Sequence, residues 1–80
     1  MTNRAEVVKQ LSKEADAYQA TEGMDRSAAE FTAWGWVMRE AIWALEASLG
    51  VSRRVAGVIF ANTVDYPPHP RCGTPAVYYL

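Results

Sequence analysis

The segment between Asp25 and Gly50 constrains the fold more than any other, because its pattern predicts one long helix with two apolar faces. Positions three and four residues apart share a helical face, and the stripe expected to face the core consists of Phe31, Trp34, Met38, Ile42, Leu45 and Leu49. Trp36 and Trp43 lie on a second stripe, which a narrow polar strip containing Arg39 separates from the first. A helix that is apolar nearly all round is normally buried, and a chain of 80 residues has few other elements to cover it.

Capping residues mark the ends of this central helix. Asp25 and Ser27 precede its first apolar residue, and Ser27–Glu30 has the pattern of a capping box, in which the serine hydroxyl accepts a hydrogen bond from a backbone N–H. We expect Gly50 to end the helix, because glycine readily adopts the left-handed conformation found at helix C-termini.

The first helix is predicted from about residue 4 to residue 20. Asn3 and Glu6 form a capping pair at its start, and Gly23 is expected to end it. This helix is amphipathic, and its apolar face is expected to consist of Val8, Leu11, Ala15 and Tyr18.

The third segment, residues 52–64, allows two secondary structures. Ser52 as an N-cap favours a helix, whereas the β-branched residues and Gly57 would suit a buried strand. We therefore predict a small all-α fold of three helices, with an α+β chain that has strands at about 55–61 and 76–80 as the alternative.

Residues 66–80 are predicted to form an extended Pro-rich arm that follows a helical domain at 1–65. All four prolines of the chain lie between Pro67 and Pro75, which excludes an α-helix there. The arm closes with an apolar stretch that we expect to dock on its own domain or on a neighbour's, namely Tyr78, Tyr79 and Leu80.

Charge and hydropathy restrict the setting of the chain. A net charge of −1 gives no general attraction to nucleic acid or to an anionic membrane. The first residues lack the apolar region of a signal peptide, and the longest apolar run, 55–61, is far shorter than the ~20 residues needed to span a bilayer. We expect a cytoplasmic chain, and its excess of Arg over Lys is typical of a GC-rich bacterial or phage genome.

The sequence predicts no enzyme, metal site or cofactor. It lacks the glycine-rich, zinc-binding and nucleophile-elbow motifs of common enzymes. His69 and Cys72 have a spacing that suits two ligands, but structural zinc takes four, and the chain has no other His or Cys. Because Cys72 lies in the arm, with no rigid element to lower its pKa, we expect an ordinary surface thiol.

One stretch resembles a known family. The run Leu49–Arg54, of sequence LGVSRR, looks like the turn and the start of the recognition helix in helix-turn-helix DNA-binding proteins. The resemblance covers residues 45–55 and implies a regulator that contacts DNA through Gly50–Arg54. Glu46 departs from the family's small residue, and residues 55–61 offer almost nothing that hydrogen-bonds a base. A glycine C-cap followed by a serine N-cap is the alternative explanation.

The function favoured by the sequence is that of a small non-enzymatic interaction protein, an adaptor or inhibitor, that self-associates or binds a protein partner. A domain this small cannot easily hide so many aromatic side chains in one core, and Trp and Arg are enriched at binding hot spots. We expect a homo-oligomer or a protein partner rather than nucleic acid or a membrane. The candidate contact residues are Trp36, Trp43, Arg39, Arg53 and Arg54. The alternative for the two tryptophans is that they belong to the core, covered by the third helix or by the C-terminal tail.

Overall fold

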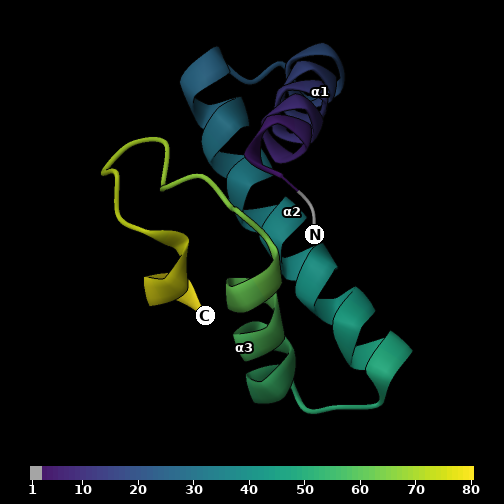
Figure 1. Cartoon of the computed structure of the whole chain (residues 1–80). Helices are drawn as coiled ribbons and strands as arrows, with labels where there is room; N and C mark the ends of the chain where they lie inside the picture. Colours follow the sequence, from purple (N-terminus) through teal and green to yellow (C-terminus); the bar gives the residue numbers. More distant parts are fainter. Residues whose placement is uncertain (1–2) are drawn as a thin grey trace.

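The computed structural model describes residues 3–80 and has the predicted all-α fold, with a long central helix (Figure 1). α1 and α3 both pack against α2, which has 24 residues. The alternative strands at 55–61 and 76–80 are wrong, because both segments are helical. No helix in the described part of the chain is long and apolar enough to cross a membrane. The elements are α1 (Arg4–Glu22), α2 (Arg26–Leu49), α3 (Arg53–Thr63) and a short 3₁₀ helix (Ala76–Tyr79).

Most of the predicted helix caps are confirmed. The Asn3 side chain accepts a hydrogen bond of 2.9 Å from the backbone N–H of Glu6. Gly23 and Gly50 end α1 and α2 with φ angles of 67° and 64°, in the left-handed region that glycine adopts without strain. The Ser52 hydroxyl caps α3 by accepting from the N–H three residues later.

The capping box predicted at Ser27–Glu30 is wrong. Asp25 is the N-cap of α2, and its carboxylate accepts a hydrogen bond of 2.8 Å from the backbone N–H of Ala28. The Glu30 carboxylate instead pairs with Arg26 Nε at 3.0 Å. Asp and Ser are comparable N-caps, and the earlier start places Arg26 in the first turn, where it reaches α1.

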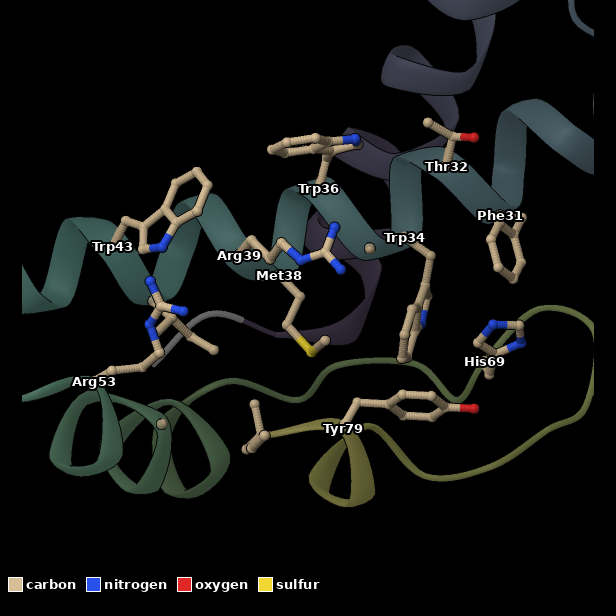
Figure 2. Close-up of a pocket in the computed structure, with 14 residues that line it drawn as sticks. Phe31, Thr32, Trp34, Trp36, Met38, Arg39, Trp43, Arg53, His69 and Tyr79 are labelled. Carbon is tan, nitrogen blue, oxygen red and sulfur yellow. The ribbon is translucent and has the colours of Figure 1, made fainter.

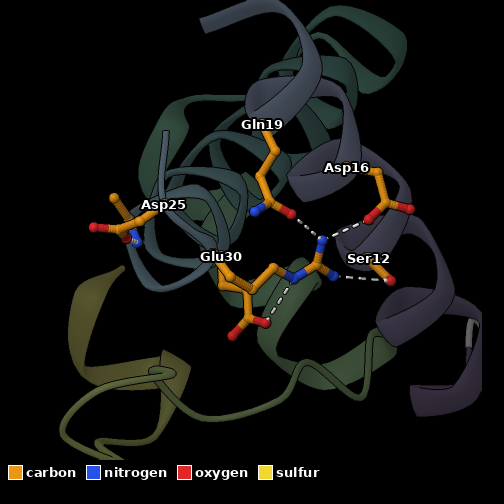
Figure 3. A network of polar contacts seen from close by, with 7 residues as sticks. Ser12, Asp16, Gln19, Asp25 and Glu30 are labelled. Atoms are coloured by element: carbon orange, nitrogen blue, oxygen red, sulfur yellow. Dashed lines mark hydrogen bonds and ion pairs between the residues drawn. The ribbon is translucent and has the colours of Figure 1, made fainter. Parts of the chain in front are cut away.

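Arg26 joins the two longest helices through a network of polar contacts (Figure 3). Besides its pairing with Glu30, its guanidinium donates to Asp16, to Gln19 at 2.9 Å and to Ser12 at 3.2 Å, all three on α1. Hydrogen bonds to Asp16 and Glu30 raise the pKa of Arg26 above its ordinary value. One side chain thereby links α1 to the start of α2.

The hydrophobic core lies where α1, α3 and the C-terminal segment meet α2. Phe60 of α3 is its largest fully buried side chain. Alanines at the α1–α2 contact leave room for the two helices to approach closely. The buried residues of the main cluster are Val7, Trp34, Val37, Met38, Ile42, Ala56, Phe60, Tyr66 and Ala76.

Three residues expected in the core are exposed instead. Val8 is 47% exposed, because α1 turns Val7 toward α2 in its place. Phe31 and Leu49 are 44% and 52% exposed. The buried arc of α2 is centred on the side between α1 and α3, and both residues fall outside that arc.

The Pro-rich arm contains no helix before Ala76, but it folds back along α2 rather than extending into solvent (Figure 1). Trp34 Nε1 donates a hydrogen bond of 2.9 Å to the Pro67 carbonyl, and the buried Tyr66 hydroxyl donates to the Trp34 carbonyl. Burial raises the pKa of Tyr66. The chain then closes a turn, in which the His69 N–H donates to the Thr74 carbonyl at 2.9 Å.

Candidate functional site

A groove of about 430 Å³ runs along one side of α2 and brings together most of the candidate contact residues. One wall belongs to α2, and the other is formed by the start of α3 and the C-terminal segment (Figure 2). We call it the α2 groove. Its lining residues are Phe31, Thr32, Trp34, Gly35, Trp36, Met38, Arg39, Ile42, Trp43, Arg53, Gly57, His69, Tyr79 and Leu80.

Trp36 and Trp43 form one edge of the groove, which we call the aromatic edge. They are 42% and 41% exposed, and their rings meet edge to face with centroids 6.1 Å apart. Of the three tryptophans, only Trp34 donates its indole N–H to a described residue. The two rings of the aromatic edge therefore keep both apolar area and a hydrogen-bond donor available for another molecule.

Two arginines cover the aromatic edge. Arg39 Cζ lies 5.4 Å from the Trp36 ring centroid, and Arg53 Cζ lies 6.0 Å from that of Trp43. At these distances a guanidinium is attracted by the negative face of the indole ring. The structure thus brings together four of the five candidate contact residues, although Arg53 comes from a different helix.

Arg53 and Arg54 differ in their surroundings. Arg53 Nε lies 3.7 Å from the Glu46 carboxylate, a long ion pair in which the arginine side chain is 72% exposed. Arg54 is exposed and does not line the groove, and its side chain makes no hydrogen bond or ion pair with residues 3–80. Its role stays a prediction.

The apolar C-terminus contributes two of its three candidate residues to the groove. The Tyr79 ring stacks on His69 with centroids 5.5 Å apart and meets Trp34 edge to face at 5.1 Å. Leu80 approaches the start of α3, where a Cβ added to Gly57 would lie 3.8 Å from the leucine Cβ. Tyr78 is 76% exposed and lies outside the groove.

The groove also contains His69, which the sequence suggested only as a possible metal ligand. His69 is only 8% exposed, and its Nδ1 accepts hydrogen bonds from the backbone N–H groups of Arg71 and Cys72. Arg71 Cζ in turn lies 5.0 Å from the Phe31 ring centroid. The prolines around His69 signal a rigid turn rather than a free arm, but no periodic pattern predicts which side chains the turn buries.

Cys72 is exposed, as expected, but it is not an ordinary thiol. Its Sγ lies 3.2 Å from the Thr74 hydroxyl and 3.4 Å from the Tyr79 hydroxyl. Hydrogen bonds from these two groups lower the pKa of Cys72 to about 7. The two hydroxyls come from the turn that closes the arm and from the 3₁₀ helix, and the sequence did not predict that they would meet at Cys72.

Alkylation of Cys72 by iodoacetamide is expected to follow a thiolate titration centred near pH 7. The pKa of Cys72 is lower in the folded chain than in the unfolded chain. The Cys72 thiolate therefore stabilises the folded arm at alkaline pH, and this stabilisation is lost as the pH falls through about 7. Tyr79→Phe should raise the midpoint by removing one donor. The urea-unfolded chain is the control and should titrate near the ordinary value of about 8.5. If the wild type, the Tyr79→Phe variant and the unfolded chain all had the same midpoint, the hydrogen bonds from Thr74 and Tyr79 to Cys72 would be contradicted.

Comparison with known proteins assigns no family. No protein-family model matches the chain, and it has no significant match to a curated protein or to a solved structure. Within residues 3–80, no three His, Cys, Asp or Glu side chains lie together as a metal site. The groove is therefore the basis for a functional proposal.

Proposed function

We propose that the chain is a small non-enzymatic interaction protein, of the adaptor or inhibitor type, that binds a polypeptide at the α2 groove. The observation that supports this most is the aromatic edge. Trp36 and Trp43 lie on the central helix of a small domain and are each about two-fifths exposed, with a guanidinium over each ring. Trp and Arg are the residues most enriched at binding hot spots.

Covering the aromatic edge would release substantial free energy. A tryptophan side chain buries about 150–250 Å² in a core or interface. Burying the remaining area of Trp36 or Trp43 would therefore gain about 2 kcal/mol per ring at roughly 25 cal/mol per Å². Arg39 and Arg53 already stack on these rings, so less of their side-chain freedom is lost on binding.

Photo-crosslinking in the native organism tests this proposal. With benzoylphenylalanine in place of Trp36 or Trp43, we expect covalent adducts to form on illumination. The matched control position is Val8, which is 47% exposed but lies on α1, away from the groove. The mass of each adduct identifies either a second copy of the chain or another polypeptide. Equal labelling at all three positions, or none at the two groove positions, would contradict the proposal.

Self-association, predicted from the sequence, is a second form of the same proposal. Val77 and Tyr78, which are 56% and 76% exposed, add apolar surface beyond the groove and favour it. Light scattering on a size-exclusion column over a wide concentration range measures it directly. If the measured mass stays that of a monomer at every concentration, self-association is excluded, and the proposed partner is a different protein.

A DNA-binding regulator is the alternative function, and the feature that favours it is the exposed Arg54 at the start of α3, whose guanidinium pairs with no carboxylate among residues 3–80. The exposed face of α3 then continues with Val55 and Val58, which are 45% and 58% exposed. Asn62 Nδ2 donates to the Val58 carbonyl, so its amide is partly used within the helix. We expect no retention of generic duplex at low salt, whereas binding that weakens steeply with salt would favour the regulator.

A further inference from the structure

We infer that the α2 groove takes a helical segment of a partner protein that carries apolar side chains on one face and Asp or Glu beside them. This inference rests on the proposed function and specifies the chemistry of the partner. Three properties of the groove support it: the lack of a strand edge, an apolar floor and a local positive charge.

The absence of a strand edge favours a helical partner. Apart from their first and last turns, α2 and α3 satisfy their backbone groups within their own helices, and among the described residues only Val64 has a bridge assignment, with no continuous strand. An extended peptide gains much of its affinity from backbone hydrogen bonds to a sheet edge, whereas a helix satisfies its own backbone and needs only side-chain contacts. The α2 wall runs from Phe31 to Trp43, about 18 Å at 1.5 Å per residue, which matches roughly three turns of a second helix.

The floor of the groove selects apolar anchors. Met38 and Ile42 are 6% and 8% exposed and lie at its base with Trp34. Every buried side-chain nitrogen and oxygen in the described chain already has a hydrogen-bond partner. A small polar ligand needs several convergent polar groups to orient it; the floor provides none, and the guanidinium and indole donors of the groove lie along its aromatic edge instead. The volume of about 430 Å³ suits the anchoring side chains of a helix that rests across the opening.

The charge of the lining selects an acidic partner. Arg39 and Arg53 line the groove, and no Asp or Glu side chain of the described chain does so, which leaves two guanidinium groups against the terminal carboxylate of Leu80. The whole chain has a net charge of −1, so this positive charge is local. Arg53 Nε faces Glu46 at 3.7 Å, and the arginine side chain is 72% exposed, so its other N–H groups can donate to a partner carboxylate while Glu46, which is 27% exposed, keeps its own partner. A guanidinium can stack on an indole and still donate in its own plane to a carboxylate.

The same charges disfavour a second copy as the occupant. A symmetric pair of chains that met through the aromatic edge would bring Arg39 and Arg53 of both copies together. Like charges in contact oppose association. A foreign acidic helix meets the same surface with favourable electrostatics.

Two labelled peptides test the inference by fluorescence anisotropy with the full chain. Each has about 14 residues, roughly four helical turns, with leucines on one face. One carries glutamates beside the leucines, and the other carries lysines at those positions. We expect the glutamate peptide to bind about tenfold more tightly, an effect equal to that of two exposed ion pairs. Equal affinity for both peptides, or binding of neither, would overturn the inference.

Charge-changed variants locate the effect. Arg39→Glu/Arg53→Glu should reverse the preference between the two peptides, and the milder Arg39→Gln/Arg53→Gln should abolish it. Arg54→Glu is the matched control, because Arg54 is exposed beside Arg53 but does not line the groove. Circular dichroism establishes that each variant is folded. If Arg54→Glu changed the preference for the glutamate peptide and the groove variants did not, the inference would be overturned.

The proposed function and this inference fail in different ways. Crosslinks from positions 36 and 43 to a second copy, or to a partner segment without acidic residues, would support the proposed interaction function. They would contradict the inference that the partner is an acidic helix. A lack of any groove-specific crosslink would contradict the proposed function itself.

Discussion

Trp34→Ala is expected to destabilise the chain by about 3–5 kcal/mol, the range for removing a large buried aromatic side chain. Trp34 is 4% exposed, and its ring meets those of Tyr66, His69 and Tyr79. Its indole N–H also donates to the Pro67 carbonyl. A chain of 80 residues has a total stability of roughly 4–12 kcal/mol, so a large part of the population should unfold or lose the packed arm.

Urea unfolding followed by circular dichroism measures this effect. Trp34→Phe retains most of the apolar contact but loses the donor to Pro67, and should cost about 1–2 kcal/mol. Trp43→Phe is the matched control on the same helix. It should change stability by less than about 0.5 kcal/mol, because Trp43 is 41% exposed. If Trp34→Ala proved as stable as the wild type, the arm could not be packed on α2 in solution.

The helices were predictable because short local rules determine where they end. Asn3, Gly23, Gly50 and Ser52 act as caps through backbone groups within four residues of themselves. Ser27 was misassigned because Asp25, two residues earlier, caps equally well. The choice between them involves Arg26, whose contacts with α1 are invisible in a local pattern.

The choice of buried faces was only partly predictable. Val7 and Val8 are neighbours, and spacing alone allows either to lie on the apolar face of α1. The structure buries Val7 because Ala15 and Ala33, which are fully buried, let α1 approach α2 along that line. Phe31 has the right spacing for the core but lies at the edge of the contact. Which residues are buried depends on the angle and position at which two helices cross. The periodicity of a single helix does not encode that geometry.

The candidate site was predictable where one helix supplies it. Trp36, Arg39 and Trp43 share one side of α2, so their spacing was enough to place them together. His69 and Tyr79 reach the groove only because the arm folds back, and prolines stop a helix without specifying where the chain goes next. The contact of the arm with Trp34 sets its direction, and a sequence pattern does not reveal a contact between such distant residues.

Trp36→Ala/Trp43→Ala is expected to remove binding at the α2 groove while leaving the helices intact. Both side chains are about two-fifths exposed and lie outside the buried core cluster, so their loss should leave the core packing in place, although the contact between the two rings is lost with them. If they are hot spots, each contributes about 2 kcal/mol or more to binding. The affinity should therefore fall by well over tenfold.

The measurement compares this double variant with a matched one. Benzoylphenylalanine at Leu80, which lines the opposite wall, reports occupancy of the groove in both backgrounds. Val8→Ala/Leu49→Ala removes apolar side chains that are 47% and 52% exposed but lie away from the groove, and it should leave the adduct yield unchanged. A double tryptophan variant that unfolds would show that the two indoles hold the core together. A folded variant with a full adduct yield would show that binding does not depend on the aromatic edge.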